Sequence, residues 1–494
     1  MAFIDGTVVN IALPALQQDL GATITNVQWV VEAYTLFLAS LMLTGGALGD
    51  RHGRKRVFAI GVVIFTAASV ACGFAPSIEA LIAARALQGA GAALMVPGSL
   101  AIISASFGDD ARGKAIGTWS AFTSITMIIG PLVGGTLIDH ASWRAIFFIN
   151  VPIAAIVLFL AWRGVPESRE SARRAPDFAG AILATAGLGS LVFGLIEASA
   201  LGFRHPAIFG TLAAGVVLLG LFIAVEWKSR SPMMPLSLFR SAAFCGANLL
   251  TLFLYAALGG GLFFVPMNLI QVHGFSATAA GAAMLPSVIL LFLLSRRAGA
   301  LSDRTGPGWL LIAGPAIAAI GFGLFTLAGT TAGYWSGFFP AFVVLGLGMS
   351  ITVAPLTNTV MSSVSRAHAG VASGINNAVS EAAGLLAVAV FGLAMTLVFQ
   401  SSLERGMEEK HVGAALKEHI HAQEQKLAAI ELPDDARGVA AGEAIHAAFI
   451  AGFRTVMGIA AALALLSALC AALTLPRRVP AHPSRPPPPR DGTP

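Results

Sequence analysis

The chain is made up largely of apolar stretches, each about as long as a helix that crosses a membrane. Hydrophobic residues account for 56% of the 494 residues and charged residues for only 11%, whereas a soluble domain carries about 25% charged residues. A helix needs roughly 20 apolar residues to cross about 30 Å of hydrocarbon. The candidate spans are residues 1–18, 30–49, 56–75, 78–104, 113–138, 145–163, 178–198, 206–226, 243–271, 277–295, 308–329, 335–358, 370–400 and 446–475. The sequence therefore predicts an all-α integral membrane protein with fourteen transmembrane helices.

Lys and Arg residues are concentrated on one side of these spans. The loops after the even-numbered spans and the tail hold most of them, whereas the short loops on the other side hold Arg144 and Arg204. Basic loops are retained in the cytoplasm, so we expect a bacterial inner-membrane protein with both termini cytoplasmic. The net charge of +5 reflects this topology, and a nucleic-acid partner is not expected.

A basic turn at 46–57 (GALGDRHGRKRV) separates the second and third spans, and residues 299–306 (GALSDRTG) repeat it far downstream. Glycines let such a turn tighten, and its aspartate can hold an opposing cation or a helix amino end. A turn used twice between spans indicates two related bundles, as in secondary transporters. The residues expected to form a cytoplasmic gate are Gly46, Asp50, Arg51, Gly53 and Arg54, with Asp303 and Arg304 as the second-half counterpart.

The repeat and the composition of the loops divide the chain into four parts. We expect a six-span bundle at 1–163, two inserted spans at 164–230, a second six-span bundle at 231–475 and a disordered, proline-rich tail at 476–494. The second bundle includes an outer loop, 401–445, which we expect to form two amphipathic helical arms outside the membrane. These arms are either a solvated hairpin or a cap that steers cations towards the outer mouth.

Two spans carry residues that are unusual in a helix surrounded by lipid. The fourth contains Arg85 and, three residues on, Gln88. An arginine in an apolar helix is costly and normally faces a cavity or a partner carboxylate. The fifth contains small residues three and four apart, which allow close helix packing, and a proline that bends the helix. These residues are Gly117, Gly130, Pro131, Gly134 and Gly135.

Together with the span-one sequence Asp5-Gly-Thr-Val-Val-Asn10-Ile-Ala-Leu13-Pro14, these motifs closely resemble those of the major facilitator superfamily, in the same order. The resemblance covers essentially the whole chain and extends to the fourteen-span drug:proton antiporters of EmrB/QacA type. It implies a major facilitator fold with two six-helix bundles and two extra spans, and the span-five pattern implies an exporter. The chain departs from that pattern at Thr126, where the family has glycine, and this loosens the packing argument there.

Few of the 25 acidic residues fall inside apolar spans, so each one that does is a functional candidate. Asp5 matches the span-one motif, Glu32 lies in span two, and Glu381 shares a polar helical face with Asn377 in span thirteen. We expect these residues to bind protons or substrate. We expect Arg85 and Gln88 of span four to couple proton binding to substrate binding. A carboxyl group away from water retains its proton, and an arriving cation favours the loss of that proton. The alternative for each residue is a polar contact between helices, or, for Glu32, a place at the outer interface.

No pattern indicates a metal, a cofactor, a nucleotide or a catalytic residue. Cys72, Cys245 and Cys470 lie inside apolar stretches without disulfide or metal-ligand spacing. The three histidines of the loop 401–445 also lack ligand spacing, and there is no phosphate-binding loop followed by Lys-Ser or Lys-Thr. We therefore expect a protein that is not an enzyme and that works on the proton motive force without a cofactor.

The sequence thus predicts a proton-coupled exporter of hydrophobic, mainly cationic, drugs or toxic compounds that works by alternating access. A dedicated exporter of a lipid, a siderophore or a self-made antibiotic is the first alternative, and a proton-coupled nutrient importer is the second. A non-transporting sensor or assembly partner is disfavoured, because buried carboxylates are costly without a function. We expect a monomer whose partners are protons, a small-molecule substrate and membrane lipids, and we keep open a periplasmic adaptor.

Overall fold

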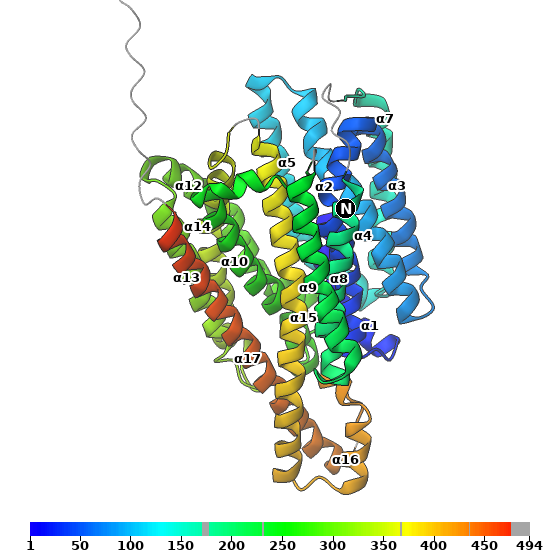
Figure 1. The fold of residues 1–494 in the computed structure, drawn as a ribbon. Helices are drawn as coiled ribbons and strands as arrows, with labels where there is room; N and C mark the ends of the chain where they lie inside the picture. The colour runs from blue at the N-terminus through cyan, green and yellow to red at the C-terminus, as the bar shows by residue number, and fades with distance from the viewer. Residues whose placement is uncertain (170–176, 230–231, 366–367, 434, 476–494) are drawn as a thin grey trace, which may run out of the picture.

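The computed structural model describes the chain except for residues 170–176, 230–231, 366–367, 434 and 476–494, so the predicted tail lies outside the described residues. Many side chains within 109–128, and that of residue 436, are likewise not described. The described residues form helices and no strand (Figure 1).

The helices occupy the predicted spans in chain order. The first half of the chain contains α1 (Ala2–Asp19), α2 (Ile24–His52), α3 (Arg54–Gly73), α4 (Ile78–Ser106), α5 (Asp109–His140), α6 (Ala145–Phe148), α7 (Asn150–Gly164), α8 (Phe178–Leu201) and α9 (Pro206–Lys228). The second half contains η1 (Leu236–Arg240), α10 (Ala242–Met267), η2 (Asn268–Val272), α11 (Ala277–Ala283), α12 (Leu285–Thr305), α13 (Gly308–Phe325), η3 (Tyr334–Phe338), α14 (Phe339–Ser362), α15 (Ala369–Glu409), α16 (Ala414–His421), η5 (Glu424–Ala429) and α17 (Ala436–Thr474).

The all-helical membrane fold predicted from the sequence is confirmed. Twelve helices among the described residues are long and apolar enough to cross a membrane. The helices α1 and α5 are not among these twelve, although both lie where a span was expected. α1 carries polar residues at both ends and a proline inside, which lowers its mean hydropathy. The count of fourteen spans therefore stays a prediction.

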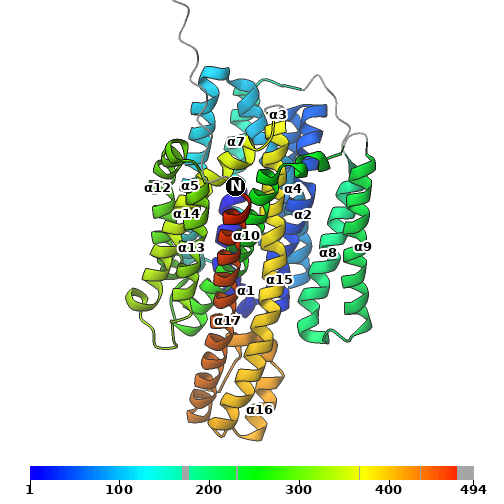
Figure 2. The same ribbon diagram turned by 60° about the vertical axis from the view of Figure 1, so that its left-hand side comes forward.

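The inserted pair α8 and α9 forms a hairpin along one side of the molecule (Figure 2). α8 packs against both α2 and α15, which come from opposite halves of the chain. Buried apolar side chains join the three helices, among them Leu36 of α2, Val192 of α8 and Leu385 of α15. α9 packs against α8 and exposes most of its other side chains. The pair therefore covers the seam between α2 and α15.

The two copies of the basic turn have the same local geometry. Gly53, between α2 and α3, has φ +113°, and Gly306, between α12 and α13, has φ +88°. In each case the glycine amide donates to the carbonyl four residues earlier, Gly49 or Ser302, at 2.9 Å. A residue with a Cβ rarely adopts these φ values, which explains why both copies place glycine there.

The predicted outer loop differs in detail from two separate arms. α15 continues to Glu409 and α17 begins at Ala436, so the arms are extensions of membrane helices, joined through α16 and η5. Ile420 and Leu427 are fully buried inside this hairpin, because the apolar faces of the two long helices extend into it. The hairpin marks one end of the molecule, here called the α16 end; the start of α1 and the end of α17 lie on the opposite side (Figure 1).

Candidate functional site

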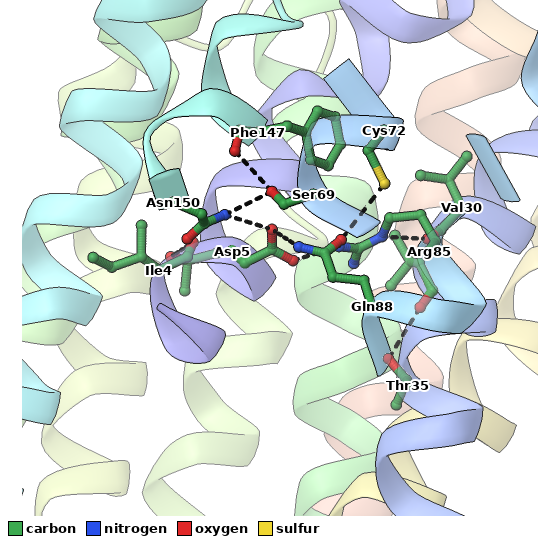
Figure 3. Close-up of polar contacts among 12 residues, drawn as sticks. Ile4, Asp5, Val30, Thr35, Ser69, Cys72, Arg85, Gln88, Phe147 and Asn150 are labelled. Carbon is green, nitrogen blue, oxygen red and sulfur yellow. Dashed lines mark hydrogen bonds and ion pairs between the residues drawn. The ribbon is translucent and has the colours of Figure 1, made fainter. Parts of the chain in front are cut away.

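A buried ion pair between α1 and α4 is the centre of the site (Figure 3). Asp5 of α1 is 3% exposed and Arg85 of α4 is 1% exposed, and the Arg85 Nη1 contacts Asp5 Oδ2. Gln88 connects both charges: its Oε1 accepts from Arg85 Nη1 at 2.8 Å, and its Nε2 donates to Asp5 Oδ1 at 2.8 Å. Three residues predicted from two separate motifs thus form one hydrogen-bonded group.

The local sequence explains why the two α4 side chains act together. Residues three apart lie on the same face of an α-helix, so Arg85 and Gln88 both point towards α1. Asp5 lies in the first turn of α1, where the positive end of the helix dipole favours a carboxylate. The guanidinium group is held further by its Nε, which donates to the Val30 carbonyl of α2 at 3.0 Å.

Three polar side chains that sequence reasoning missed extend the network. Asn150, the first residue of α7, donates to Asp5 Oδ1 at 3.5 Å and to Ser69 Oγ at 3.0 Å. Ser69 Oγ in turn donates to the Phe147 carbonyl at 2.7 Å, and Cys72 Sγ lies 3.6 Å from Gln88 Oε1. The polar Asn150 in an otherwise apolar span was a signal that could have identified it.

Tyr34 of α2 packs against the Arg85 side of the network. The Arg85 guanidinium lies 4.3 Å from the centre of the Tyr34 ring, a cation–π distance. The Tyr34 hydroxyl is buried and has no hydrogen-bond partner among the described residues. One face of this ring is therefore occupied by the protein's own cation.

Glu381 lies on α15, outside the Asp5 network. It is only half-buried, and Asn377 on the same helix is exposed. Tyr34 on α2 and Tyr255 on α10 are close enough to Glu381 for its charge to be felt at their phenol groups. Tyr255 is a further residue that the sequence did not single out. One of these tyrosines comes from each half of the chain.

Glu32 occupies the interface between α2 and α15. It is four residues from Gln28 and four from Leu36, so the three share a helical face. Gln28 Nε2 donates to the Val388 carbonyl of α15 at 2.8 Å, and Leu36 packs against Leu385 of α15. Glu32 itself is 1% exposed, and its Oε2 has no partner among the described residues. The structure therefore places it in the protein interior and not at the outer interface.

The small residues of α5 pack between α1 and α11. A Cβ built on Gly134 would lie 2.5 Å from Val8 Cγ1 of α1, and one on Gly130 would meet the Thr7 hydroxyl. A Cβ on Gly135 would lie 2.6 Å from the Ala277 carbonyl oxygen of α11. Pro131 lies inside α5. Gly117 also belongs to α5, but the side chains around it lie outside the described residues.

The α16 end is closed by polar contacts between distant parts of the chain. Asp139, just beyond the predicted fifth span, accepts from the backbone amides of Ala277 at 3.0 Å and Thr278 at 2.9 Å. Gln17 Nε2 donates to the Lys426 carbonyl at 2.9 Å and its Oε1 accepts from Gln271 Nε2 at 2.9 Å.

The charge of Asp139 is stabilised in this closed arrangement. Partial burial opposes ionisation, but the hydrogen bonds from the start of α11 outweigh that effect and hold the pKa of Asp139 below its usual value. The contact therefore favours the ionised carboxylate.

The expected cytoplasmic gate lies at the opposite end. Arg54 Nη2 pairs with Asp50 Oδ1 at 2.8 Å, while Arg51 is exposed. Glu167, which follows α7, accepts from the amides of Lys55 at 3.1 Å and Arg56 at 3.2 Å.

In this gate, Gly46 is partly buried near the Pro97 side chain of α4. Asp303 and Arg304, in the last turn of α12, are both exposed. The first copy of the turn is thus stabilised by the Asp50–Arg54 ion pair and by the Glu167 carboxylate at the amino end of α3. Glu167 was not predicted from the sequence.

Comparison with known proteins places these features in a family. The sequence profile described as Major Facilitator Superfamily matches residues 1–388. The chain is 34% identical to the tetracenomycin C resistance and export protein of Streptomyces glaucescens, over 96% of this chain and 89% of that protein. It is 33% identical to the multidrug resistance protein Stp of Mycobacterium tuberculosis, over 86% and 78%. It is 31% identical to the multidrug efflux pump LfrA of Mycolicibacterium smegmatis, over 92% and 93%.

Solved structures share the fold. A bacterial homolog to the human lysosomal transporter Spinster, in an inward-facing and occupied conformation, superposes with a TM-score of 0.64 at 18% identity, over 97% of this chain and 96% of that one. An auto-inhibited POT family peptide transporter superposes with a TM-score of 0.62 at 16% identity, over 98% of both chains. At these identities the likeness is one of fold alone.

Proposed function

The chain belongs to the Major Facilitator Superfamily, and on that premise we propose that it is a proton-coupled exporter of hydrophobic, mainly cationic, compounds. It is a multi-pass membrane transporter of small molecules and not an enzyme, and its relatives are antibiotic-resistance, multidrug-resistance and export proteins. We assign it to the fourteen-span drug:proton antiporters of EmrB/QacA type, in the inner membrane with both termini cytoplasmic. The proton motive force, without a cofactor, drives it.

The observation that carries this proposal is the buried Asp5–Arg85 pair. An acid and a base enclosed together in membrane helices are costly to maintain without a role in moving ions or substrate. When Asp5 is ionised, the pair and Gln88 hold α1 against α4. A proton on Asp5 removes one charge of the pair and leaves Arg85 without its counter-ion, so protonation alters the contact between the two helices.

Glu381 is the proposed site for the substrate cation. Its carboxyl group is half-buried and lies within electrostatic range of Tyr34 and Tyr255. Aromatic faces attract cations, and one carboxylate supplies a full negative charge. Asn377, exposed on the same helix, offers a polar contact to less strongly charged substrates. Glu32 is proposed to take a proton at the α2–α15 interface, where it has no partner.

Alternating access would exchange the closed α16 end for an open one. The contacts that would break are those of Asp139 and Gln17 with the second half of the chain. The driving force is sufficient, since each elementary charge that crosses the membrane gains about 2.3 kcal/mol per 100 mV. The ion pair of Asp50 and Arg54, with Asp303 and Arg304, is proposed to close the opposite end in turn.

A second candidate is an exporter dedicated to a self-made antibiotic. The similarity to the tetracenomycin C resistance and export protein, which extends over 96% of this chain, favours it. Both candidates share proton coupling and direction, and differ in the range of substrates. A panel of lipophilic cations and of neutral hydrophobic compounds therefore separates them.

The test is the movement of a fluorescent lipophilic cation into everted vesicles with an acidic interior. We expect uptake by the wild type, and loss of uptake in Asp5→Asn and Glu381→Gln. Glu408→Gln, which removes an exposed carboxylate in the extension of α15, is the matched control and should transport normally.

Two results would count against the proposal. Unchanged uptake in Asp5→Asn would show that the ion pair has no role in proton coupling. No uptake of any cation by the wild type, together with uptake of a neutral compound, would favour the dedicated exporter.

A further inference from the structure

Two acidic residues outside the candidate site lie together at the end of the molecule opposite α16. Asp177 immediately precedes α8, and Glu226 lies in the last turns of α9. Glu226 is only 2% exposed, although the sequence places it near the boundary of a span. Both residues belong to the inserted hairpin that stands to one side in Figure 2.

Each carboxyl group uses one oxygen for a backbone contact. Asp177 Oδ1 accepts from the Gly180 amide at 2.7 Å and so caps α8. Glu226 Oε2 accepts from the Met234 amide at 2.9 Å. The remaining oxygens, Asp177 Oδ2 and Glu226 Oε1, are buried and have no hydrogen-bond partner among the described residues.

These two free oxygens converge on one point. A Cβ built on Gly180 would lie 2.8 Å from Glu226 Oε1 and 3.2 Å from Asp177 Oδ2. Both oxygens thus border the same small space beside Gly180. A Cβ at position 180 would occupy that space, which explains why glycine stands there.

Two ionised carboxylates have acceptors but no donor to place between them, and they repel each other. A single proton converts the contact into an O–H···O hydrogen bond, which is short and strong when one partner is charged. We propose that Asp177 and Glu226 bind one shared proton, and that this proton joins the ends of α8 and α9.

The site lies at the start of α8 and the end of α9, beside the described ends of both connections of the hairpin. The connection from α7 ends at Asp177, and the connection to α10 begins after Lys228. In that second connection the Met234 amide donates to Glu226. The shared proton thus holds the two connections together. Its loss would push the carboxylates apart and weaken the contact with Met234.

In the described part of the chain, few charged groups lie around the pair. α8 is the main helix packed against α9. Asp177 is the charged residue whose electrostatic effect reaches Glu226. Lys228 is exposed at the end of α9, and Glu197 lies near the other end of α8. Arg173, Arg174 and Arg230 belong to the two connections but lie outside the described residues.

Hydrogen exchange of the full-length protein tests the proposal without relying on transport. The measured quantity is the exchange of peptides that cover Met234, corrected for intrinsic chemical exchange, from acidic to alkaline pH. We expect protection in the wild type at low pH and a several-fold loss of protection as pH rises. Glu226→Gln should stay protected at every pH, because its amide can donate to Asp177 without a shared proton.

Two controls make the result specific. Glu197→Gln, a carboxylate change on the same helix pair, should keep the pH dependence of the wild type. Infrared spectra should show a protonated carboxylic acid band in the wild type that is reduced in Glu226→Gln.

A wild type whose protection does not change with pH would overturn the proposal. So would a Glu226→Gln variant that is less protected and shows no loss of that band, since this would indicate an ionised pair balanced by the arginines of the connections.

Discussion

At the scale of single residues, the Asp5–Arg85 pair is the most demanding feature of the chain. Both side chains are almost completely buried, and Gln88 forms a hydrogen bond with each of them. Removing one partner of such a pair leaves a charge in a medium that solvates it poorly. The pair is therefore a constraint on stability as well as a candidate for proton coupling.

We expect Asp5→Asn and Arg85→Gln each to destabilise the protein, by about 3–5 kcal/mol if the remaining charge stays buried. The double variant Asp5→Asn/Arg85→Gln should lose less than either single variant, because no unpaired charge remains. The measurement is the midpoint of thermal unfolding in detergent. The control is Asp19→Asn in the same helix, whose exposed pair with Arg144 should contribute at most about 1 kcal/mol. Equal losses that simply add in the double variant would show that the two charges do not interact.

Also at the residue scale, the contact of Asp139 should depend on pH. Its pKa is lowered in the closed arrangement, so the contact is fully present above the ordinary aspartate pKa of about 3.9. It is lost as pH falls through the lower pKa of the closed state. The distance between spin labels at Ala141→Cys and Ala279→Cys should therefore increase in strong acid and stay constant near neutral pH.

The variant Asp139→Asn provides the comparison for this pH dependence. It should show a longer or broader distance distribution already at neutral pH and a weaker response to acid. An identical acid response in Asp139→Asn would assign the effect to other carboxylates.

At the scale of helices, small residues determine how closely α5 approaches its neighbours. Gly130 and Gly134 face α1, whereas Gly135 faces α11. One helix thus contacts both halves of the chain through adjacent positions. This explains why the motif contains two consecutive glycines, since successive residues on a helix point in different directions.

We expect Gly135→Ala to force α5 and α11 apart, because its Cβ would meet backbone atoms of Ala277 and Thr278 at 2.6 Å. The cost should be about 1–3 kcal/mol, typical of overpacking, and should appear as a shift towards an open α16 end. Spin-label distances across that end measure the shift. Gly458→Ala in α17, where a Cβ meets nothing within 4 Å, is the matched control. An unchanged distance in Gly135→Ala would mean that the helices can move without opening this end.

At the scale of the whole molecule, the α16 end is closed by groups far apart in the sequence. Gln17 in α1 contacts both Gln271 and the carbonyl of Lys426 in the hairpin. Gln28, near the start of α2, donates to the Val388 carbonyl of α15. The contact with the Lys426 carbonyl joins the hairpin to the first helix, so the hairpin has a structural role beyond that of a solvated loop.

We expect a short, flexible bifunctional thiol reagent to crosslink Gln17→Cys with Gln271→Cys, in a background without the native cysteines. The crosslink should hold the α16 end closed and abolish transport, and a reductant that cleaves the reagent should restore it. Gln18→Cys with Gln271→Cys is the control, because Gln18 is exposed on another face of α1. Full transport by the crosslinked protein would show that this end need not open.

The helical membrane fold and the identity of most polar candidates follow from the amino-acid sequence alone. Apolar stretches of sufficient length must form helices in lipid, where every backbone group needs a partner. Charged residues inside such stretches stand out for the same reason, which is how Asp5, Arg85 and Glu381 were identified. The glycines of the repeated turn were also predictable, because positive φ values exclude most other residues.

Which of these residues come into contact depends on how the helices pack in three dimensions. Asp5, Gln88 and Asn150 come together although up to 145 residues separate them along the chain, whereas Glu381 lies apart from them on α15. The Asp177–Glu226 pair was hidden for a related reason: each residue alone reads as the boundary of a span. Spacing along one helix reveals which residues share a face, but contacts between helices depend on how whole helices pack, and that is set by many small apolar contacts at once.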